Sequence, residues 1–128
     1  MIQPKLIHLM LCDAVSRGPD GQVSLIGLIH RISRSHFPAA LEHCTVYCRM
    51  GYGDGDFTLR LVVRGPDGEP VYDDHEGVGL CFEDVLDDAS VALQIDDLPL
   101  PEPGAYWVEA WLDGRQMPNA LPLYVDRI

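Results

Sequence analysis

The sequence Arg17-Gly18-Pro19-Asp20-Gly21-Gln22 recurs as Arg64-Gly65-Pro66-Asp67-Gly68-Glu69, and each copy lies between runs of apolar, β-branched or aromatic residues. Proline fixes φ at the first corner of a turn, and Asp-Gly supplies residues that tolerate positive φ. Asp-Gly between apolar runs is a strong signal for a β-hairpin, and Asp113-Gly114 is a looser version of it. The three turns therefore predict a small antiparallel β domain.

The segments between these turns predict an all-β chain in which residues 1–128 form one domain. Residues 57–64 show a clear alternation of apolar and polar side chains, which is typical of a strand with one buried face. The segment 98–104 contains three prolines, which cannot donate a ladder hydrogen bond, so we expect it to cross between two sheets. We expect a two-sheet antiparallel β-sandwich rather than a barrel. Its eight or so strands are expected near residues 5–16, 23–34, 44–50, 57–64, 70–72, 90–96, 105–112 and 120–127.

The first hairpin is unusual because residues 5–16 and 23–34 carry apolar side chains on both faces. A strand that is apolar on both faces is normally covered on both. The second cover must be a loop, a short helix or another subunit. The expected loop is residues 35–43, with room for one helical turn, and residues 82–89 form a second connection of that kind.

Charge and cysteine content bound the function. The net charge is −11, and residues 65–114 contain no lysine or arginine, so the chain is not expected to bind nucleic acid. No apolar run is long enough to span a membrane, and we expect no membrane partner.

Cys44 and Cys48 would lie about 13 Å apart on one strand, too far for a disulfide with each other. Pairings with Cys12 or Cys81 stay open. Cysteines used as free thiols favour a cytoplasmic protein.

Acidic residues form the densest cluster of ionisable side chains. Asp73 and His75 would share one face of a strand, which makes at most half of a metal site. The following acids could complete the site if their loop folds back, namely Glu83, Asp84 and Asp87. A divalent-metal-binding protein or a metal-dependent enzyme is therefore one hypothesis. The other interpretation is an edge strand protected by its charges.

Aromatic residues offer a second candidate site. Trp107 and Trp111 would lie on one strand face with Glu109 between them, next to Tyr106. Two indole rings on an outer face could stack against a sugar or a peptide, or they could be buried under a neighbouring strand or subunit. No nucleophile-elbow, phosphate-loop or dinucleotide motif occurs, so we assign no catalytic residue and expect no cofactor.

The segment from Leu98-Pro99 to Gly104-Ala105-Tyr106 resembles the late strands of immunoglobulin-like sandwiches. That resemblance implies that Tyr106 bonds back to the upstream backbone at a corner. A longer part of the chain resembles an uncharacterised family of small bacterial proteins, through the segments 9–14, 23–27 and 98–106. This second resemblance implies a fold and no activity.

Taken together, these features predict a non-catalytic binding or assembly module. We expect it to self-associate as a homodimer or higher oligomer, or to bind a protein or small-molecule partner. The contact surface is expected to be residues 5–34 or the tryptophan face. The metal hypothesis is the alternative.

Overall fold

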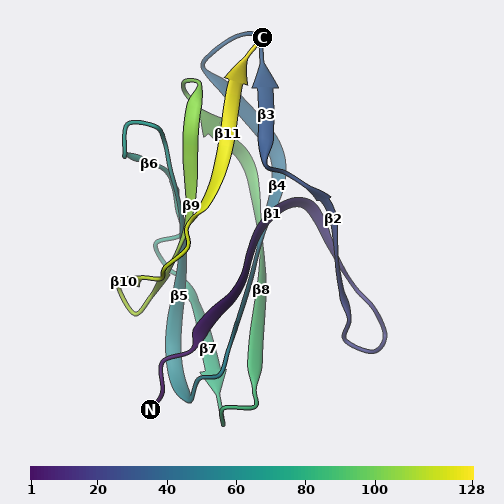
Figure 1. Ribbon diagram of the computed structural model, residues 1–128, viewed down its shortest axis with the longest axis vertical. Coiled ribbons are helices and arrows are strands. Elements are labelled where there is room, and N and C mark those ends of the chain that lie inside the picture. Colours follow the sequence, from purple (N-terminus) through teal and green to yellow (C-terminus); the bar gives the residue numbers. More distant parts are fainter.

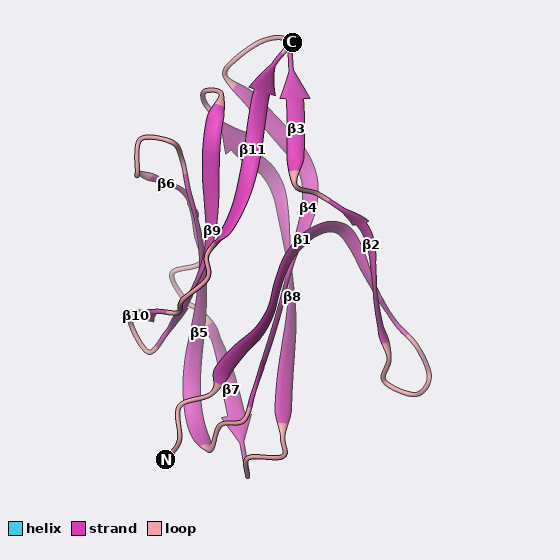
Figure 2. Cartoon of the chain, viewed as in Figure 1, coloured by secondary structure: helices cyan, strands magenta, loops and turns pink.

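A computed structural model describes all residues, 1–128, as two stacked β-sheets without a helix (Figures 1 and 2). Because no helix is present, none is long and apolar enough to cross a membrane. The strands are β1 (Lys5–Arg17), β2 (Val23–Leu28), β3 (Arg31–Arg34), β4 (Ala39–Gly51), β5 (Gly55–Arg64), β6 (Pro70–Asp73), β7 (Val78–Phe82), β8 (Asp88–Leu100), β9 (Gly104–Leu112), β10 (Arg115–Gln116) and β11 (Leu121–Arg127).

The strands divide into two sheets that we call sheet I and sheet II. Sheet I has the order β2-β1-β4-β8, and every pair in it is antiparallel. Sheet II has the order β3-β11-β9-β5-β6, with β10 on β9 and β7 on β5. Only β3 and β11 run parallel. The predicted antiparallel two-sheet sandwich is confirmed.

Period-two alternation builds the core between the sheets. On β4 the inward residues are Cys44, Val46, Cys48 and Met50, and all four are fully buried. On β5 the predicted inward residues are buried as well, from Phe57 at one end to Val63 at the other. Because side chains alternate between the faces of a strand, each sheet presents one apolar face to the other.

The repeated Arg-Gly-Pro-Asp-Gly turn has the same geometry at both sites. In the first copy, Gly18 N donates to Gln22 O at 2.7 Å, and Gly21 adopts a φ of 78°. In the second copy, Gly65 N donates to Glu69 O at 2.8 Å, and Gly68 adopts a φ of 87°. The first copy joins β1 to β2, and the second joins β5 to β6. Both predicted hairpins are therefore present.

Several strand boundaries differ from the prediction. The segment 23–34 is two strands rather than one, because the chain leaves sheet I after β2 and enters sheet II as β3. Gly27, with a φ of 68°, lies just before this switch. The turn at Asp113-Gly114 leads into β10, although β9 and β11 do pair as expected.

Neither expected helical turn forms. Residues 39–43 belong to β4, where hydrogen bonding to β8 takes precedence over local helical pairing. Residues 83–87 form a tight turn that is held by aspartate side chains. The segment 98–104 does cross between the sheets, but β8 first extends through Pro99 to Leu100. That proline is tolerated because β8 is an edge strand.

Tyr106 ties this crossover to β9. Its side chain is fully buried, and its hydroxyl donates to Glu102 O at 2.6 Å and accepts from Glu102 N at 3.2 Å. Burial raises the pKa of Tyr106, which keeps the phenol protonated. The corner role implied by the immunoglobulin-like resemblance is therefore the role that the structure gives this residue.

Removing this hydroxyl tests the corner. Tyr106→Phe is expected to lower the free energy of unfolding by about 1–2 kcal/mol, because two backbone groups of Glu102 lose their partner. Urea unfolding monitored by tryptophan fluorescence measures the change. Tyr124→Phe is the control, since Tyr124 is 42% exposed. Equal stability of the two variants would contradict the corner role.

Candidate functional site

The first hairpin stands away from the sandwich. β1 pairs with β4 only from Lys5 to Cys12, and beyond Cys12 it pairs with β2 alone. Figure 1 shows this ribbon projecting to one side of the two sheets. The hairpin therefore has its own surfaces, which the core does not cover.

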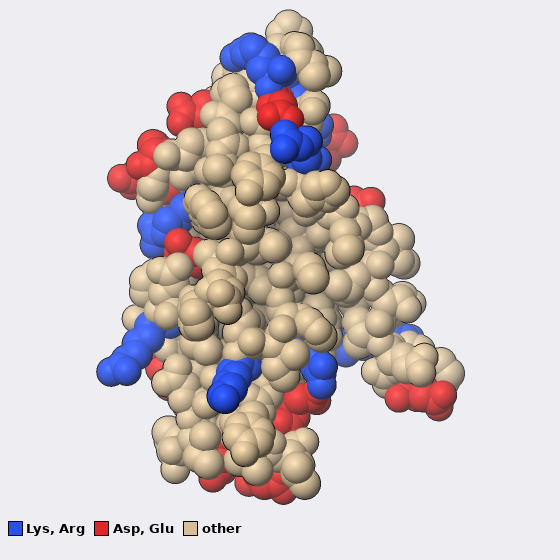
Figure 3. Space-filling model, in the orientation of Figure 1, with Lys and Arg blue, Asp and Glu red and all other residues tan.

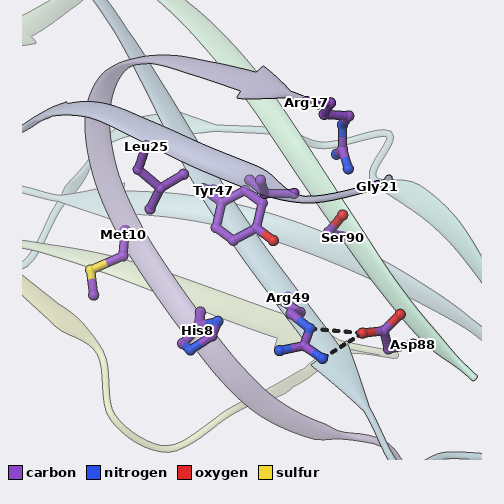
Figure 4. Close-up of a pocket in the computed structure, with 10 residues that line it drawn as sticks. His8, Met10, Arg17, Gly21, Leu25, Tyr47, Arg49, Asp88 and Ser90 are labelled. Atoms are coloured by element: carbon purple, nitrogen blue, oxygen red, sulfur yellow. Dashed lines mark hydrogen bonds and ion pairs between the residues drawn. The ribbon is translucent and has the colours of Figure 1, made fainter. Parts of the chain in front are cut away.

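A cleft of about 520 Å³ separates the hairpin from the outer face of sheet I (Figure 4). Its floor comes from three neighbouring strands, β1, β4 and β8, and its wall from the hairpin. The floor residues are His8, Met10, Tyr47, Arg49, Asp88 and Ser90, and the wall residues are Arg17, Gly21, Val23 and Leu25.

The cleft combines apolar and charged side chains. Tyr47 is only 4% exposed although it lies on the outer face of sheet I, because the hairpin covers it. Arg49 is paired with Asp88 at 2.6 Å. Arg17 makes no ion pair and no hydrogen bond through its guanidinium, and it points from the hairpin toward the cleft (Figure 4). Nothing in the sequence predicts this site. The doubly apolar hairpin predicts only that a loop, a short helix or another subunit covers its second face.

The tryptophan face lies on the outside of sheet II. Glu109 is buried there, and it accepts from Arg64 Nε at 2.9 Å and from Trp111 Nε1 at 2.9 Å. Arg60 lies over the Trp111 ring, 5.8 Å from its centroid. The indole N–H and one ring face of Trp111 are thus already engaged within the chain, whereas Trp107 is 41% exposed.

The three aromatic candidates do not form one surface. Trp107 and Trp111 do share a face, since the register places them opposite Arg64 and Arg60. Tyr106 points to the other side of β9 and is fully buried, so its ring offers no contact to a ligand on the outer face.

The acidic candidates lie in two separate places. Asp73 binds Arg60 through both carboxylate oxygens, at 2.7 and 2.8 Å. His75 Nδ1 is 3.8 Å from Asp73 Oδ2, and the His75 side chain is exposed. Asp73 pairs with Val62 on β5, whereas the strand before Glu83 pairs at Gly55. Seven residues along β5 therefore separate Asp73 from the acids that begin at Glu83, which corresponds to about 23 Å.

The acids of the β7–β8 turn bind the backbone. Asp87 accepts from Glu83 N at 2.7 Å and from Asp84 N at 3.3 Å, and Asp84 accepts from Leu86 N. These bonds fix the turn. No three His, Cys, Asp or Glu side chains in the structure converge as metal ligands would.

All four cysteines are free thiols. Cys12, Cys44 and Cys48 are buried, and Cys81 is exposed. Burial raises the pKa of Cys44 to about 11 and that of Cys48 to about 12. Thiols with such values are protonated at neutral pH and react slowly.

Thiol labelling checks this arrangement. The native protein is expected to react through Cys81 alone at pH 8, and slowly, because hydrogen bonding to Asp56 raises the pKa of Cys81. Unfolding in guanidinium should release the other three thiols, and Cys81→Ser should leave the native protein unlabelled. Rapid labelling of more than one thiol in the native state would contradict the burial.

The Asp73–Arg60 pair predicts a pH dependence of stability. Hydrogen bonding from Arg60 holds the pKa of Asp73 below its ordinary value of 3.8. The stability that this pair contributes is therefore complete above pH 3.8 and is lost as the pH falls through the lower folded-state pKa. Asp73→Asn should be less stable than wild type at pH 7, with a difference that disappears in acid. Thermal unfolding across pH measures it, and Asp74→Asn is the matched control; a pH-independent difference would contradict the pairing.

Comparison with known proteins shows the family of this chain. No curated protein sequence matches it. Among solved structures, it is similar to the crystal structure of the C-terminal domain of wzt, with a TM-score of 0.56, 12% identity, and coverage of 100% of this chain and 77% of that one. At that identity the likeness shows a shared fold only. The model of a family of unknown function (DUF6941) matches residues 8–126, and the chain belongs to that family.

Proposed function

We propose that this protein is a non-catalytic assembly module that self-associates through the free edge of β2. The single observation that carries the proposal is the composition of this edge. β2 is the outermost strand of sheet I, and its sequence Val-Ser-Leu-Ile-Gly-Leu contains no charge and no proline. An edge without such protection is able to pair with another strand.

The exposed side chains of β2 support the same conclusion. Ile26 is 54% exposed and Leu28 is 56% exposed. Leu25 lines the cleft, so its neighbour Ile26 points away from the cleft. In Figure 3, the surface over β2 shows little charge. Two chains with a net charge of −11 would repel least at an uncharged edge.

Charges, prolines or short length protect most of the other strand edges. β8 carries Pro99 and three aspartates, and β3 begins and ends with arginine. β6 is only four residues long, beginning with proline and ending with aspartate. β7 is uncharged, but its exposed positions are Gly79, which has no side chain, and Cys81, so pairing there would bury little apolar surface. β2 is therefore the edge that favours strand addition.

An antiparallel pair of β2 strands would place the two copies around a twofold axis. Such an isologous contact uses the same surface twice and closes as a dimer. It would join the two four-stranded sheets into one continuous sheet and would bury Ile26 and Leu28.

The proposal also includes a cytoplasmic location and a relationship to immunoglobulin-like sandwiches. Four cysteines that all stay free are typical of a reducing compartment, which supports the cytoplasm. The hydrogen bonds of Tyr106 at the sheet-to-sheet corner support a relationship to immunoglobulin-like sandwiches.

Analytical ultracentrifugation tests the assembly. The wild-type chain is expected to sediment as a dimer at high micromolar concentration. Ile26→Lys should weaken dimerisation about tenfold or more, because it replaces an apolar side chain at the proposed contact with a charged one. Leu86→Lys is the matched control, since Leu86 is 90% exposed on a distant turn. A monomeric wild type, or an equal effect of the control, would overturn the proposal.

A further inference from the structure

The cleft between the hairpin and sheet I is separate from the edge used in the assembly. It gathers two arginines and a histidine in a chain whose net charge is −11. His8 and Arg49 project from the floor, and Arg17 projects from the hairpin (Figure 4). A local excess of cationic groups in an acidic protein attracts anions and repels cations.

The charges of the cleft leave one arginine without a partner. Asp88 accepts from Arg49 Nε at 2.7 Å, so these two groups neutralise each other. Arg17 has no acidic partner, whereas the arginines on sheet II with carboxylates nearby are already paired, as in Arg60–Asp73 and Arg64–Glu109. One uncompensated guanidinium suits a ligand with a single negative charge. Its planar fork can donate two parallel hydrogen bonds to a carboxylate.

The rest of the cleft is suited to an apolar group. Met10 and the ring of Tyr47 lie on the floor, and Val23 and Leu25 face them from the hairpin. The volume of about 520 Å³ is in the range of small-molecule sites, which is roughly 300–1,000 Å³. Four of the ten residues that line the cleft are apolar, and the others supply polar groups that can fix the orientation of a ligand.

We propose that this cleft binds a small organic carboxylate with an apolar body. The carboxylate pairs with Arg17, and the apolar body lies between Leu25 and Tyr47. Ligand binding in the cleft does not require the dimer, because Ile26 and Leu28 point away from the cleft.

A titration with octanoate and 1-octanol tests the charge and the apolar body separately. Chemical shifts of backbone amides are followed by NMR, with Gly21 and Ser90 as reporters on the two sides of the cleft. Octanoate is expected to shift both amides in a saturable manner. Octanol, which has a chain of the same length without the charge, should bind about tenfold more weakly.

Two arginine variants locate the contact. Arg17→Gln should weaken octanoate binding about tenfold, which is the loss expected for one charge-assisted hydrogen-bonded pair, and should leave octanol binding unchanged. Arg115→Gln is the matched control, because Arg115 is exposed on β10, makes no ion pair and lies on the other sheet. Its octanoate affinity should equal that of the wild type.

Four outcomes would overturn the proposal. They are an absence of saturable shifts at Gly21 and Ser90, equal affinity for octanoate and octanol, an equal loss of affinity in both arginine variants, and shifts centred on Ile26 and Leu28. Repeating the titration with Ile26→Lys separates the two proposals, since a monomeric variant should still show saturable octanoate shifts at Gly21 and Ser90.

Discussion

The packing of β4 against β5 and β9 is the interaction on which the rest of the structure depends. Every second residue of β4 from Cys44 to Met50 is fully buried, and it faces the alternating apolar residues of β5 and β9. Because this contact uses one face of each sheet, it leaves two outer faces that must be covered or solvated. The two outer faces are covered in different ways, and this difference decides where a ligand or partner has access.

Sheet II covers its outer face with its own polar side chains. Arg60 and Arg64 extend across the strands to Asp73 and Glu109, and their stems shield Val62, which is fully buried. These side chains satisfy one another's hydrogen bonds and charges, so the outer face of sheet II is stable in water without another chain over it. Sheet I carries the cross-strand pairs His43–Asp96 and Arg49–Asp88 between β4 and β8. It is also covered in part by the hairpin, which stands off far enough to leave a cleft.

The sequence predicts those parts of the fold that depend on local pattern. The two Arg-Gly-Pro-Asp-Gly turns fix two hairpins, and the alternation in 57–64 fixes the buried face of β5. It does not predict the split of 23–34, because an apolar run that passes from one sheet to the other has the same pattern as one long strand. The positive φ of Gly27 marks the change, but a glycine within a strand is equally typical of a bulge or of a close approach between backbones.

The candidate sites depend on register, which local pattern does not contain. Alternation is enough to place Trp107 and Trp111 on one face, but only the pairing of β5 with β9 brings Arg60 over Trp111. The acids of 73 and 83–87 are close in sequence and yet lie at different heights along β5. The cleft could not be predicted for the same reason, because Arg17 and Arg49 meet only when the hairpin folds over sheet I.

The hairpin links the two proposals physically, because one thin ribbon carries both surfaces. Leu25 faces the cleft, and the next residue, Ile26, faces the free side of β2. The ribbon beyond Cys12 has only β2 as a partner for β1, so its position relative to sheet I rests on few backbone hydrogen bonds. A ligand that bridges Arg17 and the floor would hold the ribbon in place, and the β2 edge would then be ordered before a second chain arrives. Ordering a binding surface in advance lowers the entropic cost of association. Binding in the cleft should therefore favour assembly at the edge, even though Ile26 and Leu28 do not line the cleft.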